Sequence, residues 1–217
     1  MFVLQILAPS RPLLPGLHAW LSSADRARPA DLMFVLAGHM SRKHYALQLF
    51  REGLAPRVLF SVGRFEIRRF SKMALPIQLD LLRLAQDIPP QQRHFFVLFQ
   101  GMECQVEPVQ PGRFGTLTEI GSLARWLGAN PEVQSLILIS NETHLRRIRM
   151  CCRSLLPRGV GVALLAVPNS FSDSADQQSS AINSTRNDLR EILKVIVYRV
   201  LLTPWIQTFT HVARLGF

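Results

Sequence analysis

The sequence predicts a single three-layer α/β domain with a Rossmann-like arrangement and a mainly parallel sheet of about five strands. Apolar runs of strand length alternate about five times with segments of helical spacing. Glycine, proline and serine mark the boundaries between these segments. Such alternation is typical of a parallel sheet that carries helices on both faces and is wound with right-handed crossovers.

Length and composition bound the domain organisation. The chain has 217 residues and 48% hydrophobic content, which suffices for one well-packed core but not for two. Residues 1–30, rich in proline and arginine, are predicted to form an N-terminal appendage. The α/β domain is expected to span residues 31–203, and residues 204–217 are expected to form a C-terminal tail.

The first strand and helix are well marked. Residues 32–37 (LMFVLA) form an unbroken apolar run that stops at Gly38, which predicts a buried strand. Residues 41–52 place apolar side chains among polar ones, and Gly53 follows them as a helix stop. The alternation therefore begins with a strand and a helix.

The next elements are shorter. Residues 58–61 predict a second strand, with Gly63 just beyond it. Helical spacing then extends over residues 65–84, where Pro76 is expected to break the helix. A third strand is expected at residues 95–99 (FFVLF).

The middle of the chain combines an irregular segment with a helix. Residues 101–115 hold two prolines and three glycines, and they are expected to be irregular. A helix is predicted over residues 116–127, with Gly128 as its stop. Thr116 and Glu119 have the spacing of a capping box, in which each side chain bonds the other's free backbone N–H.

The last elements continue the alternation. Residues 136–140 predict a fourth strand, residues 143–155 a helix and residues 160–167 a fifth strand. Residues 169–180 are polar, with the composition of a mobile surface loop. Residues 184–202 predict a long helix.

Polar residues stand where the predicted strands end. Gly38 follows the first strand, Ser61 ends the second and Ser140 ends the fourth. The carboxyl ends of parallel strands meet at one edge of the sheet, called the rim below, where open α/β sheets bind ligands. We therefore predict a binding site on the rim. Its candidate residues are Gly38, Arg42, Ser61, Gly63, Thr116, Glu119, Ser140, Asn141, His144 and Arg147.

The helix after the fourth strand points to an anionic ligand. A helix N-terminus offers free N–H groups, and His144, Arg146 and Arg147 add positive charge. If a reaction takes place there, His144 is the candidate proton donor or acceptor, with Arg42 and Arg147 stabilising negative charge. His144 could also merely satisfy backbone groups, and Arg42 could be a solvated surface residue. The sequence does not choose among transfer, hydrolysis and binding.

Several other kinds of site lack their motifs. The dinucleotide fingerprint, the P-loop and the nucleophile elbow of α/β-hydrolases are absent. His39 and His44 have no carboxylate near them in sequence, so no metal is expected.

Cysteine usage and hydropathy predict a location. Cys104, Cys151 and Cys152 suit a reducing compartment without a disulfide framework, and the adjacent pair is expected in the core. No apolar run reaches the roughly 18 residues of a membrane span, and the N-terminus lacks the basic start of a signal peptide. A cytoplasmic location is expected.

The formal net charge of +10 comes mainly from arginine. Arginine suits phosphate and carboxylate, but a genome rich in G and C produces the same bias. Four basic residues recur at helical spacing, as on a solvated helix face, and they are Arg64, Arg68, Arg69 and Lys72. No aromatic stacking platform interleaves with them, which counts against binding of single-stranded nucleic acid. A second hypothesis is nevertheless a basic interaction protein that binds nucleic acid or an anionic membrane surface.

Five segments, in order, resemble the YdcF-like domain of SanA- and ElyC-type bacterial proteins, over residues 31–202. The matching segments are Leu36-Ala37-Gly38; Arg42 with Ala46, Leu49-Phe50 and Gly53; Ser61-Val62-Gly63; Thr116 with Glu119; and Ser140 with His144-Leu145-Arg146-Arg147.

The resemblance implies a Rossmann-like fold and a small anionic or nucleotide-type ligand. S-adenosylmethionine binding is attributed to the family and envelope biogenesis to some relatives, so S-adenosylmethionine is the cofactor that the resemblance implies. The chain departs from the family at His39, Val62 and Gly115. A third hypothesis is therefore a degenerate, non-catalytic scaffold. The oligomeric state has no sequence indicator.

Overall fold

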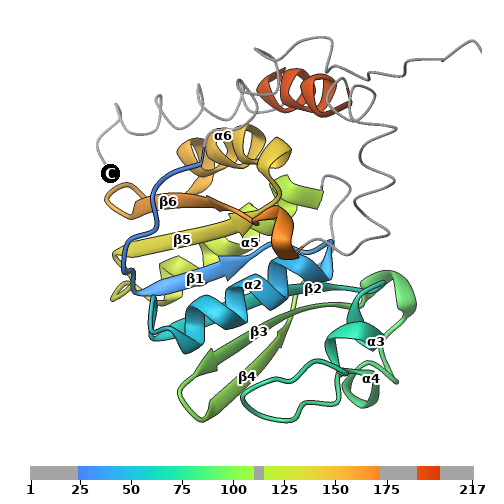
Figure 1. Ribbon diagram of the computed structural model, residues 1–217. Helices are drawn as coiled ribbons and strands as arrows, with labels where there is room; N and C mark the ends of the chain where they lie inside the picture. Colours follow the sequence, from blue (N-terminus) through green and yellow to red (C-terminus); the bar gives the residue numbers. More distant parts are fainter. Residues whose placement is uncertain (1–23, 110–114, 172–189, 201–217) are drawn as a thin grey trace, which may run out of the picture.

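The computed structural model describes residues 24–109, 115–171 and 190–200 (Figure 1). Most of the expected N-terminal appendage, the C-terminal tail, residues 172–180 of the expected loop and the first turns of the last expected helix lie outside these residues. In the described part, none of the helices has both the length and the apolar character that are needed to cross a bilayer.

The centre of the molecule is a six-stranded sheet with the order β4-β3-β2-β1-β5-β6. Four neighbouring strands, β2, β1, β5 and β6, run parallel to one another. Strand β3 pairs antiparallel with β2, and β4 pairs antiparallel with β3. The strands are β1 Leu32–Val35, β2 Arg57–Gly63, β3 His94–Gln100, β4 Glu103–Pro108, β5 Ser135–Ser140 and β6 Gly161–Ala166. The α/β class and the mainly parallel sheet are therefore confirmed, with one strand more than expected.

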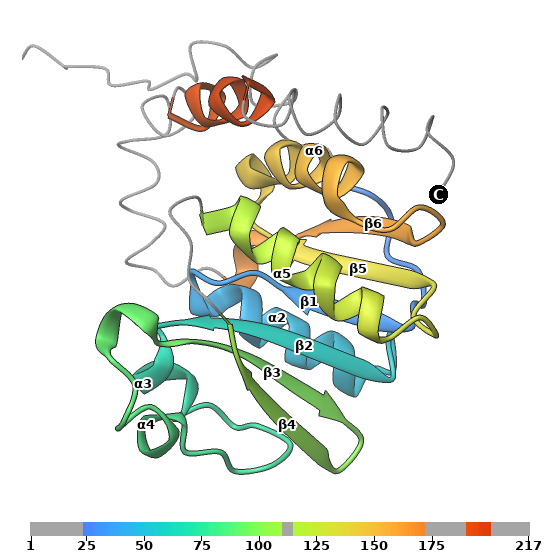
Figure 2. The same cartoon turned by 180° about the vertical axis from the view of Figure 1, so that it is seen from behind.

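Helices cover both faces of this sheet. Helix α2 lies on one face, together with the short helices α3 and α4, whereas α5 and α6 lie on the other (Figures 1 and 2). The helices and helical turns are α2 Met40–Arg51, α3 Ile67–Phe70, α4 Leu81–Leu84, η1 Pro90–Gln92, α5 Gly115–Ala129, η2 Glu142–His144, α6 Leu145–Leu155 and η3 Asn169–Phe171. Residues 190–200 form a further helical segment beside α6.

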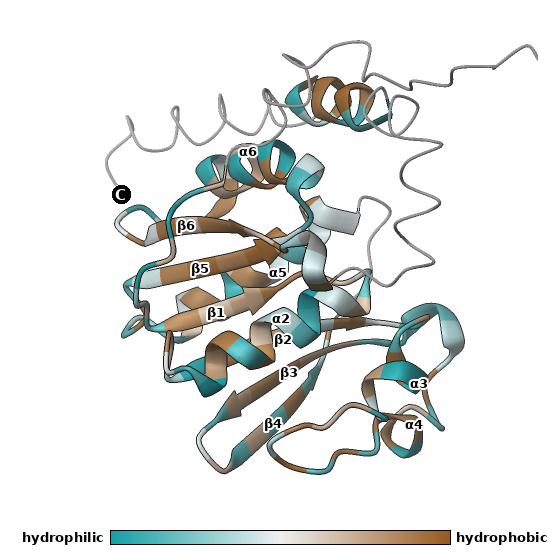
Figure 3. Ribbon diagram, viewed as in Figure 1, coloured by the Kyte–Doolittle hydropathy of each residue, from teal (hydrophilic) through white to brown (hydrophobic). Residues whose placement is uncertain are grey.

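Strand β1 shows how the two layers are packed. Met33 and Val35 face the α2 layer, whereas Leu32 and Phe34 face the α5 and α6 layer. All four side chains are completely buried. Because successive side chains of a strand point to opposite faces, a strand covered on both sides must be apolar throughout. Figure 3 shows this apolar character in β1 and β5, with hydrophilic residues on the outer side of α6.

The expectation of an irregular segment at residues 101–115 is wrong for residues 103–108, while residues 110–114 lie outside the described residues. Residues 103–108 form the edge strand β4, which pairs antiparallel with β3. Gly101, at a φ of 56°, lies in the tight turn between the two strands. Much of β4 is exposed, and its polar and apolar residues therefore alternate instead of forming an apolar run.

The break expected at Pro76 within residues 65–84 is found, but the helices on either side are shorter than the spacing predicted. They are the single-turn helices α3 and α4. Ile67, Phe70 and Leu81 pack into the α2-side core. The apolar spacing that predicted a helix is thus produced by two separate turns that pack against the same layer.

Two helix boundaries also differ from expectation. Helix α5 extends one residue past Gly128, to Ala129. The expected helix at residues 143–155 begins as the 3-10 turn η2, and His144 is the residue from which α6 continues.

Candidate functional site

The rim of the sheet contains a topological switch point between β1 and β5. Helix α2 follows β1 on one face, whereas η2 and α6 follow β5 on the opposite face. The two connections therefore diverge at the carboxyl ends of β1 and β5, which is the usual ligand position in open α/β sheets. The loop after β1 and the first residues after β5 form this part of the rim.

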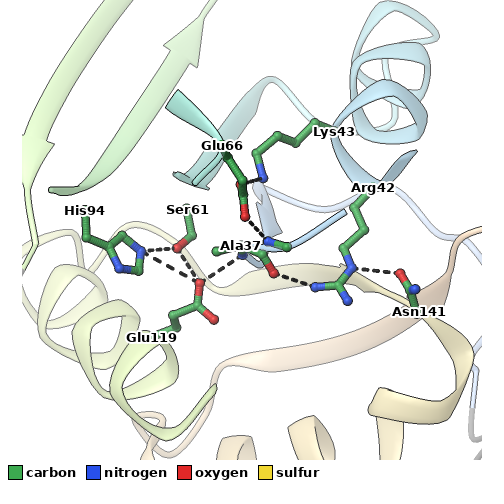
Figure 4. Close-up of polar contacts among 9 residues, drawn as sticks. Ala37, Arg42, Lys43, Ser61, Glu66, His94, Glu119 and Asn141 are labelled. Carbon is green, nitrogen blue, oxygen red and sulfur yellow. Dashed lines mark hydrogen bonds and ion pairs between the residues drawn. The ribbon is translucent and has the colours of Figure 1, made fainter. Parts of the chain in front are cut away.

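Arg42 connects these two loops (Figure 4). Its Nε–H donates to Asn141 Oδ1 at 2.8 Å, and Nη1 donates to the Ala37 carbonyl at 2.6 Å. Nη2 lies 3.0 Å from His144 Nδ1. These contacts place Arg42 on the rim. Arg42 is also buried, so the alternative of a solvated surface arginine does not hold.

The charge of Arg42 is retained despite burial. Desolvation lowers the pKa of its guanidinium to about 10, while the carboxylates of Glu119 and Glu66 raise it. At neutral pH the group therefore stays cationic and donates at all three contacts. Its planar fork can hold two loops in a fixed relation, which a lysine ammonium could not do equally well.

Gly38 makes room for this guanidinium. Its φ is 128°, a backbone conformation that favours glycine. A Cβ atom at this position would lie 3.0 Å from Nη1 of Arg42. Glycine is therefore required both by the backbone and by the neighbouring side chain.

A buried ion pair lies under the same loop. Lys43 is completely buried, and its Nζ pairs with Glu66 Oε2. The other oxygen of Glu66 accepts from the Gly38 amide (Figure 4). Burial lowers the pKa of Lys43, and the Glu66 carboxylate opposes that effect. Arg42, Lys43, Glu66 and the Gly38 amide are called the α2-side cluster below.

Glu119 reaches the rim from the opposite layer. Its Oε1 accepts from the Ala37 amide at 2.9 Å and from the Ser61 hydroxyl at 2.5 Å. Ser61 Oγ also lies 2.6 Å from His94 Nε2, and burial lowers the pKa of His94. The capping-box expectation is therefore wrong, because α5 begins at Gly115 and Glu119 turns toward the sheet.

His144 and Arg147 face a carboxylate from the C-terminal helical segment. Glu191 Oε2 accepts from Arg147 Nη1 at 2.5 Å, and Glu191 Oε1 lies 3.5 Å from His144 Nε2. Lys194 Nζ donates to the same Oε1 at 2.6 Å. Ser140, His144, Arg147 and Glu191 are called the α6-side cluster below.

His144 is held in its neutral form. Burial lowers its pKa well below the usual value, and the positive charges of Arg42 and Arg147 lower it further. Since Nδ1 faces the donor Nη2 of Arg42, we assign the proton to Nε2, which faces Glu191. His144 is therefore a hydrogen-bonding group here, and its role in proton transfer stays a hypothesis.

Two buried polar atoms of the α6-side cluster have no hydrogen-bond partner among the described residues. They are Ser140 Oγ and Arg147 Nε. Ser140 is 0% exposed and ends β5 directly before Asn141. Buried polar atoms are normally bonded, so each exception calls for an explanation.

The structure thus brings together most of the residues predicted for the site. Gly38, Arg42, Asn141 and His144 meet through direct contacts or close packing, and Ser61 meets Glu119. The Gly63 carbonyl accepts from the Glu66 amide, and Thr116 bonds Tyr198 rather than another rim residue. These two residues have supporting contacts only.

Four participants were missed, namely Lys43, Glu66, His94 and Glu191. The only sequence indicator for Lys43 was its position next to Arg42. Complete burial, as found for Lys43, is unusual for a lysine. Placing His94 at the rim requires knowing that β3 is antiparallel, because its first residue then lies beside the end of β2. Glu191 comes from a distant helix and had no indicator.

Metal binding and cysteine chemistry find no support in the described residues. No group of three metal-ligating side chains occurs there. Cys151 and Cys152 are buried in the core, as expected, and burial raises the pKa of each thiol to about 12.

Comparison of the chain with known protein families, curated protein sequences and solved structures found no match. The resemblance to YdcF-like proteins stays a prediction.

Proposed function

We propose that this protein binds a small anionic ligand, a phosphate or carboxylate compound, at the carboxyl ends of β1 and β5. The supporting observation is that Ser140 Oγ, at the end of β5, and Arg147 Nε, on the helix α6 that follows, are buried without a partner among the described residues. A buried donor left unsatisfied costs about 1–3 kcal/mol, and more when the group is charged. An anionic oxygen that accepts from such a group would remove that cost.

The charges at the site favour an anion. Arg147 and Lys194 carry positive charge beside the neutral His144, and Arg42 adds a cation on the other side of His144. The Glu191 carboxylate already lies against these groups, which supports the affinity of the cluster for a planar acidic group. The resemblance to YdcF-like proteins adds S-adenosylmethionine, through its carboxylate, to the compounds worth testing.

Thermal-shift measurements test the site with four probes: orthophosphate, pyrophosphate, ATP and S-adenosylmethionine. At a ligand concentration of 100 times Kd, binding stabilises the native state by about 2.7 kcal/mol. We expect one class of probe to raise Tm in the native protein. In Ser140→Ala, which lacks the orphan hydroxyl, we expect the same probe to give at most a small shift.

The matched control is Ser71→Ala. The Ser71 hydroxyl is also buried without a partner among the described residues, but Ser71 is the C-cap residue of α3 and does not lie at the ends of β1 and β5. Neither substitution removes a hydrogen bond of the described structure, so both ligand-free proteins should keep their Tm within a few degrees. Equal ligand shifts in Ser140→Ala and Ser71→Ala would contradict the proposal.

A further inference from the structure

The helical segment 190–200 has two different faces, one buried against the domain and one exposed. Its inner face carries Glu191, Val195 and Tyr198, all of them buried, and Tyr198 packs under the guanidinium of Arg147. This face attaches the segment to the domain beside α6, as Figures 1 and 2 show.

Its outer face is an exposed apolar stripe. The stripe consists of Leu193 (62% exposed), Ile196 (54%), Val197 (42%) and Val200 (66%). These positions follow the i, i+3, i+4, i+7 pattern, and at 3.6 residues per turn their centre lies about 180° from the inner face. Among the described residues, half of the eight large apolar side chains that are exposed belong to this one segment. Single exposed apolar residues are common, whereas a continuous stripe marks an interaction surface.

The exposed charges along the stripe are all positive. Arg190 and Lys194 lie on one flank and Arg199 on the other. The single acidic residue of the segment, Glu191, is buried against Arg147. An apolar stripe bordered by basic side chains matches a helix that lies in the plane of an anionic bilayer, with its arginines and lysines reaching the headgroups.

We propose that the outer stripe of residues 190–200 docks this protein on an anionic membrane surface. The net charge of +10 favours the same partner, because anionic lipids attract basic proteins at long range. A second copy of the chain fits less well. A two-fold symmetric contact would place the same basic flanks against each other. The stripe lies on the opposite side of the helix from Glu191, so this inference is independent of the ligand site.

Vesicle co-sedimentation tests the proposal with the whole chain. We expect binding to phosphatidylcholine vesicles that contain about one third phosphatidylglycerol, and little binding to phosphatidylcholine alone. High salt should release the protein, since a short helix needs both the apolar and the electrostatic contribution. Leu193→Asn/Val200→Asn should weaken binding at least about tenfold, because two buried apolar side chains are lost. Arg190→Gln should weaken it about fivefold.

The matched control is Phe65→Asn/Met102→Asn. Phe65 and Met102 are 78% and 79% exposed and lie on the β2–α3 and β3–β4 connections. This variant loses similar exposed apolar character and should bind as the native protein does. Equal binding by the stripe variant and the native protein would overturn the proposal, as would a lack of binding to any vesicle.

Two further outcomes would identify a different occupant and also overturn it. Sedimentation of the native protein as a dimer, which the stripe variant loses, would show that a second copy covers the stripe. If the native protein is a monomer that does not bind vesicles, and the stripe variant has a clearly lower Tm, then another segment of the same chain covers the stripe.

Discussion

The two polar clusters beside the end of β1 differ in how completely their atoms are bonded. In the α2-side cluster, Lys43 pairs with Glu66, and Glu66 holds the Gly38 amide. The α6-side cluster contains Glu191 from a helix far along the chain, and it leaves Ser140 Oγ and Arg147 Nε without partners among the described residues. The bonding of the first cluster holds the loop after β1 in place, whereas the unpartnered atoms of the second support our proposal of a ligand site there.

The largest expected effect is on the α2-side cluster. Lys43→Met leaves the Glu66 carboxylate buried without its ammonium partner, and breaking such a pair costs about 3–5 kcal/mol. Urea denaturation of the variant should show a loss of this size. Lys72→Met, which removes an exposed lysine, should stay within about 0.5 kcal/mol of the native protein. A loss below about 1 kcal/mol in Lys43→Met would mean that the cluster is not structural.

The glycine of the α2-side cluster, Gly38, should give an intermediate effect. Gly38→Ala combines an unfavourable φ with a Cβ contact to Arg42, whereas Gly53→Ala, at a φ of 80°, meets no atom within 4 Å. Backbone strain alone costs about 1–3 kcal/mol at either position. We expect Gly38→Ala to be the more destabilising in urea denaturation and to reduce ligand binding at the rim as well. Equal losses of stability in Gly38→Ala and Gly53→Ala would show that the Arg42 side chain moves away from the added Cβ without a free-energy cost.

The smallest effect is the pH dependence that His144 contributes. Its pKa in the folded protein lies well below the unfolded value of about 6.5. As pH falls below about 6.5, the unfolded chain binds a proton that the folded protein does not, so the free energy of unfolding decreases. Above that pH the contribution is constant. His144→Gln, whose amide oxygen can still accept from Arg42, should flatten the decrease between about pH 6.5 and 5. Parallel stability curves for the two proteins would show that His144 has no such role.

The parallel strands were predictable because their environment is uniform. β1 and β5 are buried on both faces, so their residues form apolar runs with clear ends. The edge strand β4 is half exposed, and its alternating pattern was obscured by the glycines and prolines around it. Local pattern thus reveals an element best when all its residues meet the same environment.

The candidate site was predictable to the extent that strand ends define it. Gly38 and Asn141 follow strand ends, Ser61 lies near the end of β2 and Ser140 ends β5. Parallel strands must present those ends on one edge. Glu119 was also predicted, but for a local cap rather than for its contact with Ser61. A side chain four bonds long can reach either partner, and only packing selects one.

The sequence by itself determined the alternation of strands and helices, the burial of β1 and β5, and the edge of the sheet on which polar residues gather. These features follow from local periodicity and from the chain connections that parallel strands require. Tertiary structure alone decided that Lys43 is buried against Glu66, that His94 meets Ser61, and that Glu191 faces Arg147. Such contacts depend on register and on helix docking across 23 to 44 residues of chain. No local pattern records them, because a buried polar or charged group needs a partner and only the fold decides which group lies within reach.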